Sequence, residues 1–406
     1  MTRDELNGWL RLTLTPGVGN ETSRKLLAAF GLPATLFSQS QIALRQVVSE
    51  RQAAALVSEP PGLPELLQIT WDWLQARDNQ HGERQIVALG DAGYPAALLT
   101  IEDPPIMLYL LGQCAAPQDR ATLETQEPSA YAPYLLGEGL GHSLAIVGSR
   151  NPTAQGAQNA RQFARALCAG GMTIVSGLAL GVDAQAHEGA LEGVQQGAAA
   201  RHGMLATVAV VGTGLDRVYP KAHLDLARRI AQHGLLISEY PIGTPPLAVN
   251  FPRRNRLIAG LTRGTLVVEA ALKSGSLITA RLAAEQGKEV FAIPGSIHSI
   301  LSRGCHALIR QGAKLVETDS DILEELGLQT ASKSIAESAD KSSASEVSES
   351  ENSLLIALGF DPVSLESLAA RTGLETSQLL AGLMALELEG HVGRLPGGLF
   401  QRMGLA

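Results

Sequence analysis

The stretch Asn250-Phe-Pro-Arg-Arg-Asn-Arg-Leu-Ile-Ala-Gly260 and the residues after it decide how this chain is interpreted. A proline two residues after Asn250 suits the first turn of a helix. The next segment, Arg263-Gly-Thr-Leu-Val-Val-Glu-Ala270, has the pattern of a buried strand, and Lys273-Ser-Gly-Ser-Leu-Ile-Thr279 opens a second helix. A helix, a strand and a helix in this order indicate an α/β fold.

The first of these helices is basic. Between Asn250 and Arg263 the chain has four arginines, at positions 253, 254, 256 and 263, and no Asp or Glu, although its formal net charge is −8. Helix N-termini favour anions, and arginine forks bind phosphate oxygens in pairs. We therefore interpret Arg253, Arg254 and Asn255 as facing an anionic ligand. The alternative interpretation is a solvated helix face with ordinary turn glycines.

Strand-like and helical segments alternate regularly through the main part of the chain. Apolar segments at 144–147, 172–175, 205–211, 235–238, 265–268 and 290–293 are each followed by a polar or Gly-containing turn, and helical segments separate most of them. This alternation predicts right-handed crossovers and an extended Rossmann-like parallel sheet with helices on both faces, over residues 81–327. The turns follow strands, so they converge on the carboxyl edge of the sheet, where such folds bind ligands.

The predicted site at that edge combines small residues with the basic ones. Its glycines allow a ligand to approach the backbone, and its hydroxyls supply hydrogen bonds. The residues concerned are Gly148, Ser149, Ser176, Gly177, Ser274, Gly275, Ser276 and Thr279.

Three further regions flank this domain, and one lies within it. Residues 1–80 read as short helices, with a turn at Leu14–Asn20 that resembles a SAM/helix-hairpin-helix motif. We interpret residues 114–142 as a loop or insertion and the Ser-rich, acidic residues 328–352 as a flexible linker. Residues 353–406 predict a winged-helix-like domain. Its second helix, Thr376–Leu388, has no Lys or Arg, which favours contact with protein over contact with DNA.

Several function classes are disfavoured. No apolar run is long enough to span a membrane and the N-terminus lacks the apolar region of a signal peptide, so we expect a cytoplasmic protein. The three cysteines and the scattered histidines have no metal-ligand spacing, so we expect neither a metal nor a cofactor. No nucleophile and base pair is evident. Asp183 and Glu269 lie near the functional edge, where hydrogen bonding of neighbouring loops is favoured over a role as a base.

At this point the chain resembles a known family. The motifs Gly148-Ser-Arg150, Ser176-Gly-Leu-Ala-Leu-Gly-Val-Asp183, Tyr219-Pro-Lys221, Asn250-Phe-Pro-Arg-Arg-Asn-Arg256 and Ser274-Gly-Ser-Leu-Ile-Thr279 are similar to those of the DNA processing protein A (DprA/Smf) family. The similarity spans about residues 85–322. It implies a non-catalytic protein that binds single-stranded DNA in a basic pocket, forms a homodimer and loads the recombinase RecA during natural transformation, with single-strand-binding protein as a further partner. It also adds Arg150 and Lys221 to the DNA-binding residues, beside Arg253, Arg254 and Asn255.

Two other interpretations stay open. The segment Arg263-Gly-Thr-Leu-Val-Val-Glu269 faintly resembles the signature of nucleotide phosphoribohydrolases, in which an Arg and a Glu act at a glycosidic bond. Alternatively, the chain is a scaffold whose helical ends bind proteins. Aromatic residues form only 4 % of the chain, which argues against extensive base stacking, with Phe251 and Tyr240 as the candidates for an exception.

Overall fold

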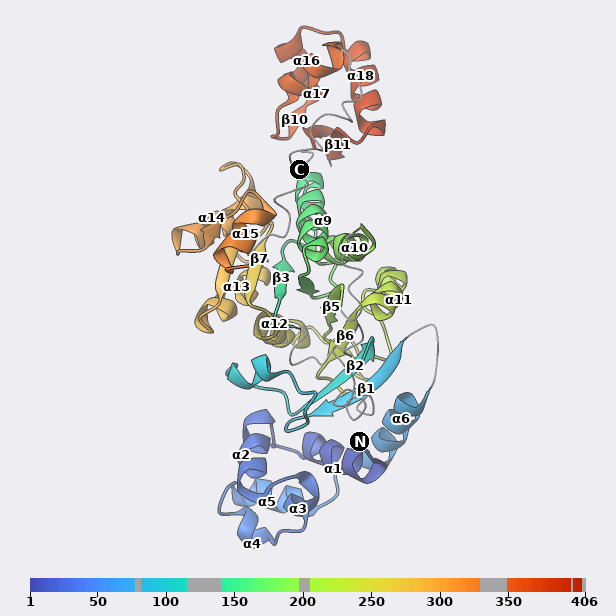
Figure 1. Ribbon diagram of the computed structural model, residues 1–406, viewed down its shortest axis with the longest axis vertical. Coiled ribbons are helices and arrows are strands. Elements are labelled where there is room, and N and C mark those ends of the chain that lie inside the picture. Colours follow the sequence, from blue (N-terminus) through green and yellow to red (C-terminus); the bar gives the residue numbers. More distant parts are fainter. Residues whose placement is uncertain (77–81, 115–139, 197–204, 329–348, 396, 404–406) are drawn as a thin grey trace, which may run out of the picture.

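The computed structural model describes residues 1–76, 82–114, 140–196, 205–328, 349–395 and 397–403. The segment that we interpret as an insertion and most of the predicted linker therefore lie outside the described residues. An N-terminal helical domain, a central α/β domain and a C-terminal domain follow one another along the longest axis of the molecule (Figure 1).

The N-terminal domain consists of six helices, namely α1 (Arg3–Leu14), α2 (Asn20–Phe30), α3 (Pro33–Phe37), α4 (Gln41–Leu44), α5 (Glu50–Val57) and α6 (Leu63–Gln75). Two of its helix starts are capped by side chains that form capping boxes, Thr2 at α1 and Ser49 at α5. The turn predicted at Leu14–Asn20 joins α1 to α2, and Gly17 there has a positive φ of 78°. Arg24 on α2 donates to the Asp103 carboxylate (2.8 Å) and to the Pro104 carbonyl (2.7 Å), so it ties this domain to the next one.

The central domain contains a nine-stranded sheet in the order β1-β2-β6-β5-β4-β3-β7-β8-β9. The strands are β1 (Glu83–Ala88), β2 (Met107–Gly112), β3 (Ser143–Val147), β4 (Thr173–Ser176), β5 (Thr207–Val210), β6 (Leu235–Ser238), β7 (Gly264–Val267), β8 (Glu289–Ala292) and β9 (Lys314–Leu315). The seven strands from β3 to β9 pair in parallel, whereas β1 and β2 add an antiparallel edge beside β6. The predicted Rossmann-like fold is confirmed, with this antiparallel extension.

Helices cover both faces of the sheet. Helices α9 (Ala154–Ala169), α10 (Val182–Gln196) and α11 (Leu224–His233) pack on one face. On the other face lie α12 (Asn250–Leu261), α13 (Ser276–Glu285) and α14 (Arg303–Arg310). The short elements are η1 (Ala96–Thr100), η3 (Lys221–His223), η4 (Ile300–Ser302) and α15 (Asp319–Glu325). The central parallel strands are therefore buried on both faces, as β3 shows with five buried residues in succession, whereas both residues of the edge strand β9 are exposed.

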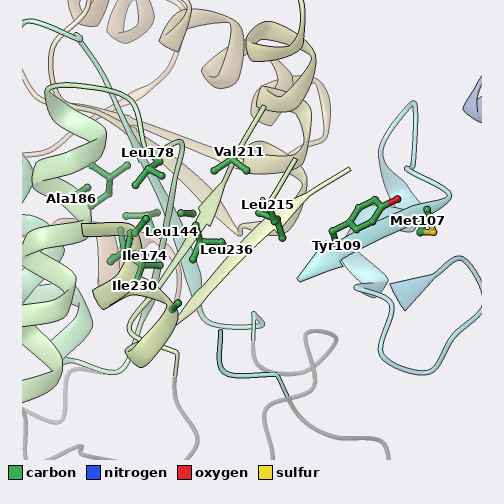
Figure 2. Close-up of a cluster of buried hydrophobic side chains, with 14 of the residues drawn as sticks. Met107, Tyr109, Leu144, Ile174, Leu178, Ala186, Val211, Leu215, Ile230 and Leu236 are labelled. Carbon is green, nitrogen blue, oxygen red and sulfur yellow. The ribbon is translucent and has the colours of Figure 1, made fainter. Parts of the chain in front are cut away.

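The strand residues alternate between two cores. Leu144 and Ile146 of β3 point into one cluster, and Ala145 and Val147 point into the other, because successive side chains of a strand face opposite sides. Figure 2 shows the first cluster, in which side chains of β3, β4 and β6 meet those of α10 and α11. Tyr109 extends this cluster toward the N-terminal domain, where its ring packs edge-on against Trp73 at 6.1 Å between centroids.

The C-terminal domain has a core of its own. It comprises α16 (Glu349–Leu358), β10 (Val363–Ser364), α17 (Leu365–Thr372), α18 (Thr376–Leu388), β11 (Val392–Leu395) and β12 (Leu399–Arg402), with the sheet order β10-β12-β11. This is the predicted winged-helix architecture. Helix α16 begins within the segment 328–352 that we predicted to be linker, because Leu354, Leu355 and Leu358 supply an apolar face that packs on the rest of the domain. Strands β11 and β12 contact α9 (Figure 1).

Candidate nucleic-acid interface

The order of the strands places a switch point between β3 and β7. From β3 the sheet continues through β4, β5 and β6 in one direction, and through β7, β8 and β9 in the other. The first turns of α12 and α13, and the loops after β3, β4 and β5, all lie at the carboxyl edge beside this point. Open α/β sheets bind ligands in such a place.

Two side chains of α12 fasten the helix to the strand ends. Asn250 donates from Nδ2 to the Gly212 carbonyl at 3.1 Å. Arg254, which is 4 % exposed, donates from Nη1 to the Gly177 carbonyl at 2.7 Å and also to the Val210 carbonyl. The start of α12 is thereby held over the ends of β4 and β5.

Asp183 is the buried counter-ion of Arg254. A Cβ added to Gly177 would lie 2.6 Å from both Arg254 nitrogens and from Asp183 Oδ2, so the two side chains and the glycine meet at one point. Burial lowers the pKa of Arg254 to about 10, and the Asp183 charge opposes this change. Burial raises the pKa of Asp183, and the Arg254 charge opposes that rise. Packing inside the protein therefore requires a glycine at position 177. Arg254 is required for the hydrogen bonds that it donates to strand-end carbonyls.

The structure separates the four arginines of the basic run. Arg253 is exposed at the start of α12, whereas Arg254 is buried. Arg256 pairs with Glu239 and lies 3.5 Å from an Asp103 oxygen. Arg263 lies at the opposite edge of the sheet, where it donates to the Leu326 carbonyl and lines a hollow of about 460 Å³ with Thr262 and Lys288. Only Arg253 of the four presents its charge to solvent at the carboxyl edge.

Other predicted residues bring two further cations to this edge. Arg150, in the loop after β3, and Lys221, at the start of η3, are both exposed. The guanidinium of Arg150 lies over the Phe251 ring, 5.9 Å from its centroid. The Phe251 ring in turn lies 5.6 Å from that of Tyr219, two residues before Lys221. These contacts join the three segments that carry Arg150, Arg253 and Lys221 into one surface, which we call the basic-aromatic surface.

The Ser-Gly-Ser turn adjoins α12. Asn255 donates from Nδ2 to the Gly275 carbonyl at 3.3 Å. The hydroxyls of Ser274 and Ser276 share a hydrogen bond of 2.5 Å. A Cβ on Gly275 would meet nothing within 4 Å, so the backbone of this turn is open to approach.

The remaining predicted residues lie deeper. Ser176 is fully buried and donates to the Ile146 carbonyl at 2.6 Å, and Thr279 is 1 % exposed. Ser149 accepts from the Asn151 N–H at 3.1 Å. Gly148 packs closely, because an added Cβ would lie 2.7 Å from a Val182 methyl group and 3.0 Å from the Glu269 carbonyl. These residues shape the loops from within, and direct contact between them and DNA stays a prediction.

Sequence reasoning missed Tyr219 as a site residue. Its side chain is 49 % exposed, yet its ring is held by Phe251 from a segment far along the chain. Tyr240, which the sequence offered as a stacking candidate, instead donates its hydroxyl to the Asn250 carbonyl at 3.2 Å. The signal that could have identified Tyr219 in the sequence was its position directly before Pro220 and Lys221.

The two carboxylates considered as bases hold loops in place. Asp183 accepts from the Ala179 N–H at 3.2 Å, besides its pairing with Arg254. Glu269 accepts from the Thr153 N–H at 2.9 Å and from the Thr153 hydroxyl at 2.6 Å, which fixes the start of α9. The hydrogen-bonding interpretation of both residues is confirmed. Among the described residues no group of His, Cys, Asp and Glu is arranged to hold a metal ion, and no helix is long and apolar enough for a membrane span.

His187, next to this network, makes folding sensitive to acid. Its Nδ1 lies 2.7 Å from the Thr207 hydroxyl, and burial, helped by His223 and Arg254, lowers its pKa from 6.5 to about 3. As the pH falls, the unfolded chain takes up a proton at this histidine before the folded chain does. The stability that the neutral His187 side chain contributes is therefore complete above pH 6.5 and is lost as the pH falls toward 3. At about pH 5 this group is expected to lower the free energy of unfolding by about 2 kcal/mol relative to pH 7.

Urea unfolding of the wild type and of His187→Gln at both pH values checks this expectation. The variant is expected to lose about 2 kcal/mol less than the wild type between pH 7 and pH 5, because the carboxylates of the two proteins are the same. Equal pH dependence in the two proteins would contradict it.

With this geometry established, comparison with known proteins identifies the family. Residues 136–327 match the family described as DNA recombination-mediator protein A, and residues 338–398 match the DprA winged helix domain. Protein Smf of Escherichia coli is 38 % identical over 80 % of this chain and 78 % of its own length. Protein Smf of Synechocystis is 33 % identical over 99 % of this chain and its full length. The chain belongs to the DNA processing protein A (DprA/Smf) family.

A solved structure agrees with this assignment. The X-ray structure of DprA from Streptococcus pneumoniae has a TM-score of 0.60 and 33 % sequence identity, and the match covers 80 % of this chain and 98 % of that one. Family members are DNA recombination mediators, so the basic-aromatic surface is a candidate interface for DNA in this DprA/Smf protein.

Proposed function

We propose that this DprA/Smf family member binds single-stranded DNA through the basic-aromatic surface at the carboxyl edge of the sheet. The observation that carries the proposal is that Arg150 lies over the Phe251 ring, which contacts the Tyr219 ring, while the exposed Arg253 and Lys221 lie two residues after these two aromatics. In a chain with a net charge of −8, a local cluster of exposed cations is needed to neutralise phosphates. The unstacked bases of a single strand can lie on exposed aromatic rings, whereas the bases of duplex DNA are less available for such stacking.

The two rings supply the test for single-strand preference. Phe251→Ala and Tyr219→Ala remove stacking surfaces but no charge, so they are expected to weaken binding of single-stranded DNA by about 1–3 kcal/mol for each base that is no longer stacked. Binding of duplex DNA should change little, so the preference for single strands falls. Fluorescence anisotropy with a labelled oligonucleotide, single-stranded or annealed, measures both affinities.

A matched control is Tyr94→Phe. Tyr94 is a buried aromatic residue away from the basic-aromatic surface, and its hydroxyl donates to the Pro105 carbonyl. Removal of this hydroxyl should leave DNA binding unchanged. If the single-strand preference of the Phe251 and Tyr219 variants equals that of the wild type, the rings are not stacking platforms and the site must be sought elsewhere.

The wider role follows from the family. We propose that the bound strand is passed to the recombinase RecA during DNA uptake by natural transformation, in the cytoplasm, with single-strand-binding protein as a further partner. A homodimer is part of this proposal. One support for it is the exposed apolar group Leu272, Ile297 and Leu315, which lines a hollow of about 540 Å³ near α14.

We also propose that the protein is not catalytic. The alternative, a phosphoribohydrolase-like activity, requires Glu269 to act at a glycosidic bond. Both oxygens of that carboxylate accept hydrogen bonds from Thr153, and a Cβ on Gly156 would lie 2.3 Å from the carboxylate carbon, so the group is packed against the start of α9. Release of free adenine from AMP by the pure protein would favour the enzyme instead.

A further inference from the structure

The second helix of the C-terminal helix-turn-helix, α18, lacks the chemistry of a DNA-reading helix. In winged-helix proteins the equivalent helix enters the major groove. Helix α18 has no Lys or Arg, and the acidic side chains on it and next to it, Glu375, Glu387 and Glu389, are exposed. A helix with this charge is repelled by phosphates.

None of the arginines of this domain lies on α18, and each contacts another group within the domain. Arg371 donates to the Ala357 carbonyl at 3.0 Å. Arg394 lies over the Phe400 ring at 5.3 Å, and Arg402 lies over the Phe360 ring at 4.9 Å. Residues 353–406 contain no other Arg and no Lys. The charged side chains on α18 and directly beside it are therefore all acidic.

Helix α18 is apolar on two sides. Leu379, Leu383 and Leu386 are at most 1 % exposed and pack into the core of the domain. Leu380, Met384 and Leu388, spaced four residues apart, are 40 %, 64 % and 83 % exposed. A spacing of four residues places these three side chains in one stripe along the helix. Such apolar stripes are normally buried, yet within the part of the chain that the structure describes this one is left exposed.

We propose that the stripe Leu380-Met384-Leu388 is a docking surface for a helical segment of another protein, with apolar residues at helical spacing and Lys or Arg beside them. The apolar side chains match the stripe, and the basic ones match Glu375, Glu387 and Glu389. Met384 suits such a surface because its flexible side chain adapts to a partner. A second copy of α18 would instead bring like charges together.

Selection from a peptide library tests this proposal with the full chain. Phage-displayed peptides of about 16 residues, long enough for about four helical turns, are selected on the wild type and on Leu380→Ser/Met384→Ser/Leu388→Ser. We expect the wild type to enrich peptides with apolar residues three or four apart and a net positive charge. Their affinity for the triple variant should be at least tenfold lower.

A control variant guards against general loss of surface hydrophobicity. Leu32 and Ile42 are 63 % and 77 % exposed in the N-terminal domain, so Leu32→Ser/Ile42→Ser should bind the selected peptides like the wild type. All three substitutions on α18 replace exposed side chains, and an unchanged melting temperature confirms that the variant is folded.

Four results would overturn the proposal. Enrichment of the same peptides by the triple variant, or no enrichment of basic amphipathic peptides by the wild type, would show that the stripe is not their site. A lower molar mass of the triple variant in light scattering would assign the stripe to a second copy of this chain. If the triple variant, but not the control variant, lost binding of duplex DNA, the stripe would be assigned to DNA.

Discussion

Arg254→Met is expected to lower the free energy of unfolding by about 3–5 kcal/mol, the largest effect predicted for a single residue of the site. The substitution leaves Asp183 buried without a counter-ion and leaves the Gly177 and Val210 carbonyls without their donor. Removing one member of a buried pair is much more harmful than removing both, because the remaining charge has no compensation. Urea unfolding at pH 7 measures the change.

The neighbouring residue provides a matched control. Arg253 is exposed, so Arg253→Met should change the free energy of unfolding by no more than about 0.5 kcal/mol. The double variant Arg254→Met/Asp183→Asn should recover part of the loss, because no unpaired charge then stays buried. If Arg254→Met and Arg253→Met were equally stable, Arg254 would not be the residue that anchors α12.

The triple variant Arg150→Ala/Lys221→Ala/Arg253→Ala is expected to bind single-stranded DNA about 10²–10³-fold more weakly at low salt, if each cation contributes about 1 kcal/mol or more. The affinity of the wild type should fall as salt rises, because phosphate binding releases counter-ions. Removing three phosphate contacts should reduce the slope of log affinity against log salt by about 2. Anisotropy titrations at several salt concentrations measure both quantities.

The same variant tests the proposed transfer to RecA. If the basic-aromatic surface holds the strand, RecA filament formation on DNA coated with single-strand-binding protein should fall together with DNA affinity. Arg45→Ala is a suitable control, because Arg45 is 49 % exposed in the N-terminal domain and pairs with Glu50 there. Unchanged affinity and salt slope in the triple variant would place the DNA site elsewhere, and normal affinity with failed RecA loading would separate the two parts of the proposed function.

Much of the fold was predictable from the sequence because it depends on short-range pattern. The apolar runs, the intervening helices and the turns after each strand placed β3 to β8 within a few residues and led us to predict a site at the carboxyl edge. The antiparallel pairing of β1 and β2 was not predicted. The apolar runs of β1 and β2, which are joined through Pro95 and Asp103-Pro-Pro105, do not by themselves indicate their partner strands, because strand pairing depends on distant residues.

The sequence by itself determined the α/β architecture and the family, and it predicted the segments of the candidate site, because periodicity and motif spacing are properties of neighbouring residues. Only the tertiary structure decided what each arginine does. Arg253 and Arg254 are adjacent and chemically identical, yet one is exposed and the other is buried against Asp183 and two strand-end carbonyls. Likewise, only folding brings Tyr219 to Phe251. The direction in which a side chain points is set by the packing of segments far apart in the chain, which local sequence does not encode.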